Sequence, residues 1–300
     1  MPSILWSGER SDRKAPVRCV LGAVVHDLSY ELVLGLPPPV PSSPFTLDPQ
    51  IKQETAWVGP KRSRHSTIVD RAGVSATATD VDDNLVTFPA LVDPSEPFLA
   101  QLGEPGRFPE LYALRERLRR WRFYHHFPTD PPAPARHPGP GVFTSVLADD
   151  GRDLAASLAT ISHIGDGTTL DQTIEEAFPG SRLRVVGDAT AFAIQLEQPG
   201  LRRPMAGHEL SDGTLRYLYL AAALLSPRPA ELLVLNEPET SLHASLLGPL
   251  AHLVAEASRS TQIIVTTHAT ELSEQIATLT GSSQLHLRRS ASGATQVTQA

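Results

Sequence analysis

The sequence has 300 residues, more than the usual ~100–200 residues of one domain, which predicts one large domain or two coupled domains. Hydrophobic residues make up 41% of the chain and charged residues 20%, a composition that excludes a disordered chain. The net charge of −7 argues against binding of nucleic acid through the charge of the whole molecule, so any such contact would need a local basic patch.

Cysteine usage and the N-terminal residues indicate the compartment. Cys19 is the only cysteine, which excludes a disulfide within the chain and is typical of a reducing compartment. The first residues hold no apolar stretch of a signal peptide, and no run of about 18 apolar residues occurs anywhere. We therefore expect a cytoplasmic protein that does not cross a membrane.

The N-terminal third, residues 1–92, reads as strand-rich. Residues 17–33 form two β-rich runs separated by His26 and Asp27, which predicts a hairpin. Four further short runs, rich in Thr and Val and bounded by turn residues, predict an antiparallel meander: 51–58, 67–69, 75–79 and 84–88.

The middle, residues 93–178, reads as a helical insertion. Apolar residues recur at helical spacing at Leu111, Leu114, Leu118 and Trp121. The proline-rich stretch 128–140 excludes a helix or a central strand and predicts a loop or connector. Two further helices are predicted at 154–164 and 170–178.

The last part, residues 179–300, changes to an alternation of strands and helices. After probable strands at 183–186 and 191–196, a helix from Thr214, a strand at 231–237, a helix from His243, a strand at 262–268 and a helix from Thr270 are predicted. Such alternation predicts an α/β fold whose parallel sheet is joined by crossover helices.

Polar side chains follow two of these strands directly. The apolar run 232–235 leads into Asn236, Glu237 and Glu239, and the next strand leads into Thr267 and His268. In α/β sheets, ligands bind beyond the carboxyl ends of the strands. We expect these groups to meet at one edge of the sheet.

A third segment, Ser211, Asp212 and Gly213, directly precedes a predicted helix, whose free N–H groups and dipole would attract an anion. Each feature also has a plain structural explanation. Glu237 can simply end a strand, His268 can cap a helix, and Ser211 and Asp212 can be ordinary N-cap residues. Their common order and spacing favour a functional set.

The series LSDGT, LLVLNEPETSLH and IVTTHA resembles the C-terminal half of an ABC-type ATPase head, in the branch that includes RecF, SMC proteins and many predicted AAA-type ATPases. The strong motifs cover about residues 207–272. The resemblance implies a P-loop NTPase-like fold with a parallel core sheet in residues 179–300, an antiparallel N-terminal part in 1–92 and a helical insertion in 93–178.

The resemblance also assigns roles at the dimer interface. Its signature motif, which touches the γ-phosphate of a nucleotide held by the opposite protomer, matches Leu210, Ser211, Asp212, Gly213 and Thr214. Its D-loop, which crosses the interface, matches Ser241, Leu242 and His243. A nucleotide-dependent dimer is therefore implied, either a homodimer or a pairing with a complete ATPase.

The remaining matches concern hydrolysis. The Walker B strand of the family ends in Asp-Glu, where Asp helps to hold Mg²⁺ and Glu handles the attacking water, and Asn236 and Glu237 occupy these positions here. His268 matches the switch histidine that contacts the γ-phosphate. ATP and Mg²⁺ are thus the implied ligands, although the neutral amide of Asn236 predicts weak metal binding through water.

The family's P-loop has no counterpart in these residues. No G-x-x-x-x-G-K-[ST] motif occurs, and the three lysines are Lys14, Lys52 and Lys61. Pro60, next to Lys61, removes a backbone donor that a phosphate loop needs. We expect the chain to start downstream of a P-loop and to bind ATP weakly or not at all. The alternatives are a partner that supplies its signature in trans to a complete ATPase, and a degenerate, non-hydrolysing relative.

Two weaker expectations complete the sequence analysis. Arginines 115, 117, 119, 120 and 122 surround Trp121, a pattern that suits DNA contact but is more typical of the solvated face of a helix. The competing functional class is a non-enzymatic interaction or DNA-binding module that keeps the fold without the chemistry. The function that we expect is ATP binding and hydrolysis by a dimeric head. This chain alone would be inactive, because it has no P-loop.

Overall fold

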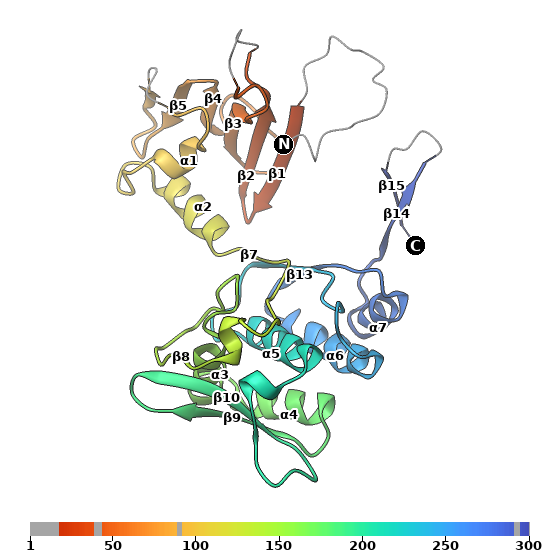
Figure 1. Ribbon diagram of the computed structural model, residues 1–300. Helices are drawn as coiled ribbons and strands as arrows, with labels where there is room; N and C mark the ends of the chain where they lie inside the picture. The colour runs from red at the N-terminus through yellow and green to blue at the C-terminus, as the bar shows by residue number, and fades with distance from the viewer. Residues whose placement is uncertain (1–17, 39–43, 89–91, 291–294, 300) are drawn as a thin grey trace. The chain divides into compact units, whose positions relative to one another are not determined.

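The computed structural model describes residues 18–38, 44–88, 92–290 and 295–299, so Lys14 lies outside the described residues (Figure 1). The chain forms two compact units. The first comprises residues 1–119 and 287–296, and the second comprises residues 120–286 and 297–300. The expected division into residues 1–92, 93–178 and 179–300 stays a prediction, because the two compact units do not test which residues form each functional part.

The first unit is built on an antiparallel sheet in the chain order β1-β2-β3-β4-β5-β6. Its strands are β1 (Arg18–Val25), β2 (Leu28–Gly35), β3 (Gln50–Val58), β4 (Thr67–Ala72), β5 (Ser75–Thr79) and β6 (Leu85–Phe88). The first hairpin turns at His26 and Asp27, with His26 at a φ of 56°. The structure agrees with the hairpin and meander expected from the turn residues.

A buried ion pair fastens the helical end of this unit to its sheet. Glu54 on β3 and Arg71 on β4 are fully buried, with Oε2 and Nη1 3.3 Å apart. Glu54 also accepts hydrogen bonds from the N–H groups of Phe98 and Leu99, which begin the short helix α1 (Phe98–Gln101). Helix α2 (Pro109–Arg119) follows and buries Leu111 and Leu114.

The second unit contains the parallel sheet, in the order β13-β12-β7. Its strands are β7 (Arg122–Tyr124), β12 (Leu232–Asn236) and β13 (Gln262–Thr266). The register pairs Val234 with Phe123 on one side and with Ile264 on the other. The predicted parallel sheet is present, and the sequence analysis missed β7.

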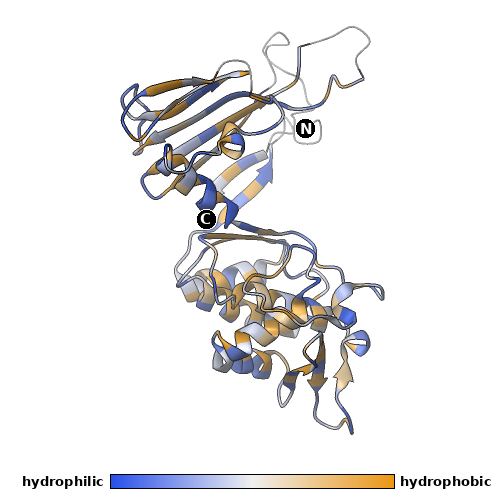
Figure 2. Cartoon of the chain, turned by 90° about the vertical axis from the view of Figure 1, so that its left-hand side faces the viewer, coloured by the Kyte–Doolittle hydropathy of each residue, from blue (hydrophilic) through white to orange (hydrophobic). Residues whose placement is uncertain are grey.

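Helices share a hydrophobic core with this sheet. They are α3 (Leu154–His163), α4 (Gly167–Ala177), α5 (Asp212–Leu224), α6 (Leu247–Ala257) and α7 (Thr270–Thr280). Every residue from Leu215 to Leu224 is buried, so α5 is the central helix of this unit. Leu233 and Leu235 of β12 join the same hydrophobic core, and Figure 2 shows many hydrophobic residues on these helices.

The proline-rich stretch belongs to a second, antiparallel sheet. A short 3-10 helix at Pro134–Arg136 precedes β8 (Gly139–Pro140), which pairs with β10 (Ala191–Glu197). Strand β10 also pairs with β9 (Arg182–Gly187) and β11 (Met205–Ala206). Stacking of Phe127 on Tyr219 of α5, with ring centroids 4.6 Å apart, holds the start of the stretch.

Two helices differ from the expected elements. The α2 helix ends at Arg119, so Trp121 lies outside it, although its spacing continued the helical pattern. The helix expected from His243 begins as a 3-10 turn, Ala244–Leu246, before α6.

At the end of the described chain, β14 (Leu285–Arg289) pairs with β15 (Thr295–Gln299). Within the described residues, each helix is too short or too polar to cross a membrane.

Candidate functional site

The candidate site lies at the carboxyl edge of the parallel sheet. Because β7, β12 and β13 run in the same direction, their last residues deliver His125, Asn236, Glu237 and His268 to one edge. Strands of a parallel sheet place their following loops together, which is where ligands bind in α/β proteins. The structure therefore brings the two predicted strand ends together, and β7 adds His125 to them.

The turn after β12 holds Glu237 in an uncommon conformation. Its φ is 47°, in the left-handed region, and Pro238 follows it. Two contacts fix this turn: the N–H of Glu237 donates to Thr266 O at 2.8 Å, and Arg216 Nη2 donates to Glu237 O at 3.2 Å. A left-handed residue other than glycine costs about 1–2 kcal/mol, and such residues cluster at functional sites.

Glu237 and His268 form a pair. Oε1 of Glu237 lies 3.2 Å from Nε2 of His268, and the side chains are 45% and 89% exposed, respectively. The carboxylate and the imidazole therefore both reach solvent at the sheet edge. A general base and a phosphate-contacting group must both be accessible to a ligand, and this geometry allows that.

Asn236 lies in a hydrogen-bonded row across the strands. Its Oδ1 accepts from Thr266 Oγ1 at 2.6 Å, and its Nδ2 lies 2.7 Å from His125 Nδ1. An amide nitrogen only donates, so Nδ1 of His125 accepts in this arrangement and a neutral ring carries its proton on Nε2. Both polar atoms of Asn236 are engaged by side chains.

Glu239 is a central residue that the sequence analysis noted without a role. Its Oε1 accepts hydrogen bonds from Thr267 Oγ1 at 2.5 Å, His268 N at 2.9 Å and Ala269 N at 3.3 Å. Helix α7, which begins at Thr270, has no side-chain cap on Ala269, so this carboxylate serves its N-terminus. Glu239 thereby positions the backbone that carries His268.

Arg216 connects α5 to the turn that carries Glu237. It is 5% exposed, and burial lowers the pKa of its guanidinium while the Glu239 carboxylate opposes that shift. Its Nη2 contacts Glu237 O, and its guanidinium carbon lies 5.8 Å from the centre of the Phe127 ring. A buried cation thus joins the helix that follows LSDGT to the turn that carries Glu237.

The LSDGT segment begins α5. Ser211 is the N-cap, and its Oγ accepts from Thr214 N at 3.1 Å. Asp212 pairs with the buried Arg136, whose Nη2 lies 2.7 Å from Asp212 Oδ1 and whose Nη1 donates to Leu210 O at 2.7 Å. Arg136, from the proline-rich stretch, therefore fixes both sides of this helix start.

The loop Ser241–His243 lies against the start of α5. Ser241 has a φ of 67°, and a Cβ added at Gly213 would meet Ser241 O at 2.8 Å, so only glycine fits this approach. Leu242 packs against the hydrophobic core, and His243 Nδ1 accepts from Ser245 N at 3.2 Å as the cap of the following turn. The predicted signature and D-loop segments are therefore neighbours.

The site residues thus fall into two groups in the described part of the chain. Gly213 contacts the Ser241 loop, and Glu237 contacts His268, but no hydrogen bond or ion pair joins Ser211 to Glu237 or His268. The sequence analysis assigned no role to His125, Arg136, Arg216 or Glu239. Of these four residues, only Glu239 could be suspected from the sequence, because it lies two residues after Glu237, beyond the end of the same strand.

The residues at this sheet edge offer few ligands to Mg²⁺. Within the described residues, no group of three or more His, Cys, Asp and Glu side chains is placed to hold a metal ion. The Asn236 oxygen is already engaged by Thr266, which leaves Glu237 as the accessible carboxylate. The residues present do not form a complete Mg²⁺ site.

An acid-sensitive contact precedes the LSDGT segment. Arg203 donates to both carboxylate oxygens of Glu209 at 2.7 Å, and Ala206 N donates to Oε2 at 2.9 Å. The Arg203 hydrogen bonds, aided by Ala206, lower the pKa of Glu209 to about 2. The ionised carboxylate therefore closes the 3-10 turn that leads into Leu210.

The chain matches a known protein family. Residues 90–274, more than half of the chain, match the family described as "AAA domain, putative AbiEii toxin, Type IV TA system". The chain belongs to this AAA-domain family. The predicted AAA-type ATPase and its α/β, P-loop NTPase-like fold class are thereby confirmed. ATP and Mg²⁺ are used in AAA-type ATPases in general.

No curated protein matches the sequence. Among solved structures, SMC heads are similar to the chain. The Smc head with a coiled coil and joint from Pyrococcus yayanosii is 17% identical, with a TM-score of 0.38 over 44% of this chain and 26% of that one. The SmcHead bound to the C-winged helix domain of ScpA is 10% identical, with a TM-score of 0.46 over 91% and 75%. The Thermotoga maritima SMC head is 16% identical, with a TM-score of 0.39 over 83% and 74%. The chain thus spans about a quarter of the first of these proteins.

Proposed function

We propose that this AAA-family chain is the part of an ATPase head that carries the signature, the Walker B end and the switch histidine, and that it works in a nucleotide-dependent dimer. The observation that carries the proposal is the pairing of Glu237 with His268, 3.2 Å apart and open to solvent at the carboxyl edge of the parallel sheet. Both residues come from strand ends, as ligand-binding groups do in α/β folds.

The chemistry of phosphoryl transfer requires such a pair. An attacking water must be held in line with the γ-phosphate, and the charge on its oxygens must be neutralised. Glu237 is the carboxylate that would orient the water. His268, 89% exposed, would face the γ-phosphate, with Glu239 holding its backbone in place.

The signature would act on a nucleotide held by another protomer. Ser211 and Asp212 are exposed at the start of α5, where the first N–H groups of a helix have no partners within the helix. Ser241 and His243, next to them, are also exposed. An exposed strip of this kind supports contact in trans, which two-fold symmetry would repeat at a second site.

The P-loop would come from residues outside these 300 or from another chain. Lys52 lies on β3 and Lys61 follows Pro60 in a turn of the first unit, and neither begins a helix as a P-loop lysine does. Parallel sheets are normally covered on both faces, yet Phe123 and Ile264 of the second unit are 59% and 46% exposed. A further lobe bearing the P-loop would cover such a face.

Asn236 supports a second candidate, a head that binds nucleotide or a partner without hydrolysing ATP. Its amide is neutral and is hydrogen-bonded to both Thr266 and His125, so it offers Mg²⁺ no charge, and its oxygen already accepts one hydrogen bond. DNA binding stays a prediction. Turnover of ATP distinguishes the two candidates.

The test compares ATP turnover by the chain alone and by the chain joined to, or mixed with, a P-loop-bearing polypeptide of the same family. The proposal predicts turnover and ATP-dependent dimerisation only with the P-loop present. Loss of both on Ser211→Arg substitution, which blocks the signature, would support action in trans. Dimerisation with ATP but without turnover would favour the non-hydrolysing head, and neither response would contradict both candidates.

A further inference from the structure

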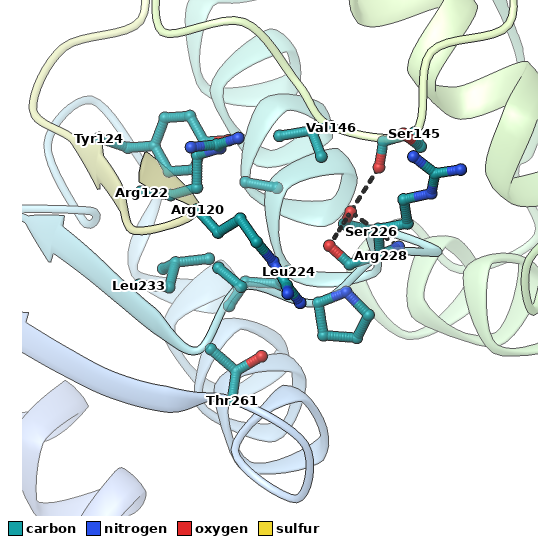
Figure 3. A pocket seen from close by; sticks show the side chains of 13 residues that line it. Arg120, Arg122, Tyr124, Ser145, Val146, Leu224, Ser226, Arg228, Leu233 and Thr261 are labelled. Carbon is teal, nitrogen blue, oxygen red and sulfur yellow. Dashed lines mark hydrogen bonds between the residues drawn. The ribbon is translucent and has the colours of Figure 1, made fainter. Parts of the chain in front are cut away.

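A pocket lies at the other end of the parallel sheet, away from the candidate site. Its lining includes Arg122 and Leu233, near the starts of β7 and β12, and Thr261, just before β13. The end of α5 and the loop that follows it close another side. The pocket has a volume of about 200 Å³ and lies entirely within the second unit (Figure 3).

Three arginines give this pocket a positive lining. Figure 3 shows Arg122 beside Tyr124, Arg120 across the middle of the view, and Arg228 beside Ser145 and Ser226. Guanidinium groups bind carboxylate and phosphate oxygens through paired hydrogen bonds. Arg122 Nη1 already donates to Trp121 O at 2.8 Å, so Arg120 and Arg228 are the groups that indicate an oxyanion as the ligand.

The negative charge near the pocket is smaller than the positive charge of its arginines. Glu231 Oε1 lies 3.9 Å from Arg120 Nη1, a distance too long for a hydrogen bond, and the carboxyl end of α5 adds a partial negative charge. No acidic side chain among the described residues lies within ion-pair distance of Arg228. The charges of Arg120 and Arg228 therefore exceed that of Glu231.

The Arg228 loop is held in place before any ligand arrives. Pro227 and Pro229 flank Arg228 and fix their own φ angles. Ser226 Oγ donates to Ser145 O at 2.6 Å and accepts from Arg228 N at 3.3 Å. Little backbone entropy would be lost on binding, and the exposed side chain of Arg228 can reach a ligand.

The pocket floor is apolar. Leu224 and Leu233 are 8% and 3% exposed, and Val146 and the Tyr124 ring complete the floor. Burial raises the pKa of Tyr124 above its usual value, and its hydroxyl donates to Leu147 O, so the ring faces the pocket as an apolar surface. A hydrated inorganic ion would leave this floor unused.

We propose that this pocket binds a small organic anion, in which a phosphate or carboxylate group is attached to a compact apolar body. The oxyanion would contact Arg120 and Arg228, and the apolar body would lie on Leu224 and Leu233. The volume is below the ~300–1,000 Å³ of pockets for drug-sized ligands, so a nucleotide would not fit inside. This site is independent of the proposed ATPase function.

Titration of the 300-residue chain with phenyl phosphate, benzoate and the neutral benzyl alcohol, followed by calorimetry or amide NMR shifts, tests the proposal. At least one anion should bind, with the amides of Ser226 and Arg228 shifting, and benzyl alcohol should bind at least tenfold more weakly. The stronger anion identifies phosphate or carboxylate as the natural group. Binding of neither anion, or equal binding of benzyl alcohol, would overturn the proposal.

Substitutions in the pocket test where the anion binds. Arg228→Gln and Arg120→Gln should each weaken anion binding about tenfold or more, because each removes a charged hydrogen-bond donor to the oxyanion. Arg202→Gln, at an exposed arginine away from the pocket, should leave it unchanged. Val146→Phe should block the floor while keeping all three arginines. Equal effects of Arg202→Gln and Arg228→Gln would show non-specific charge attraction and contradict the site.

Discussion

The carboxylate of Glu237 lies 3.2 Å from Nε2 of His268, across the ends of β12 and β13. The two residues are 31 positions apart in the sequence, and the parallel pairing of Asn236 with Thr266 brings them together. A left-handed backbone at Glu237 and the hydrogen bonds of Glu239 to the His268 loop maintain this arrangement. The pair is therefore a product of the sheet rather than of local sequence.

In an assembly that includes a P-loop, Glu237→Gln should lower ATP turnover about 100-fold or more, because the amide cannot accept a proton from water. ATP binding should persist, so the variant should accumulate as an ATP-bound dimer. Phosphate release and light scattering measure the two effects. Glu274→Gln, an exposed change on α7, is the matched control, and equal turnover in both variants would contradict the role of Glu237.

Asn236→Asp should raise Mg²⁺ affinity or ATP turnover in the same assembly, because a carboxylate adds charge beside the predicted metal position. The structure adds His125, which lies 2.7 Å from the Asn236 amide and would pair with the new carboxylate when protonated. We expect about a tenfold change, read from the Mg²⁺ dependence of turnover. Asn84→Asp, in the first unit, serves as control, and an unchanged metal dependence for Asn236→Asp would remove this argument.

Arg136→Gln should destabilise the second unit by about 2–3 kcal/mol, because it removes the pair with Asp212 and leaves Leu210 O without its buried donor. Urea unfolding measures the change. Arg152→Gln is the control, since Arg152 is 70% exposed and contacts only the exposed Asp150, so it should cost less than about 0.5 kcal/mol. Equal losses of stability would contradict the role of Arg136.

The Glu209 pair predicts a pH dependence at low pH. The pKa of Glu209 is lowered in the fold to about 2, so its contribution to stability is present above its ordinary pKa of 4.5 and is lost as the pH falls toward 2. The amide signal of Ala206 should titrate with a midpoint near pH 2. Arg203→Gln should move that midpoint up toward 4.5, and a midpoint already near 4.5 in the native chain would contradict the pairing.

Local patterns predicted much of the fold. The continuous apolar run before Asn236 predicted β12, and turn residues such as His26 and Asp27 predicted the antiparallel hairpin. Strand β7 was missed because three residues, Arg122–Tyr124, directly follow a helix whose apolar spacing continues to Trp121. A strand this short is set by its pairing with β12 rather than by its own sequence.

The roles of the candidate site residues stay predictions, and the structure shows only how these residues are placed. Order and spacing singled out Glu237, His268 and the residues of LSDGT. Arg136 acts on Asp212 across 76 positions, and Arg216 acts on Glu237 across 21, so no local pattern marked either residue. Buried arginines that hold distant turns become visible only when the packing is known.

We propose that these 300 residues carry the groups that handle water and contact the γ-phosphate, but not the loop that binds the nucleotide phosphates. Calorimetry with Mg-ATP and the 300-residue chain tests this proposal most directly. We expect no ATP binding in the micromolar range, and micromolar binding would contradict the proposal.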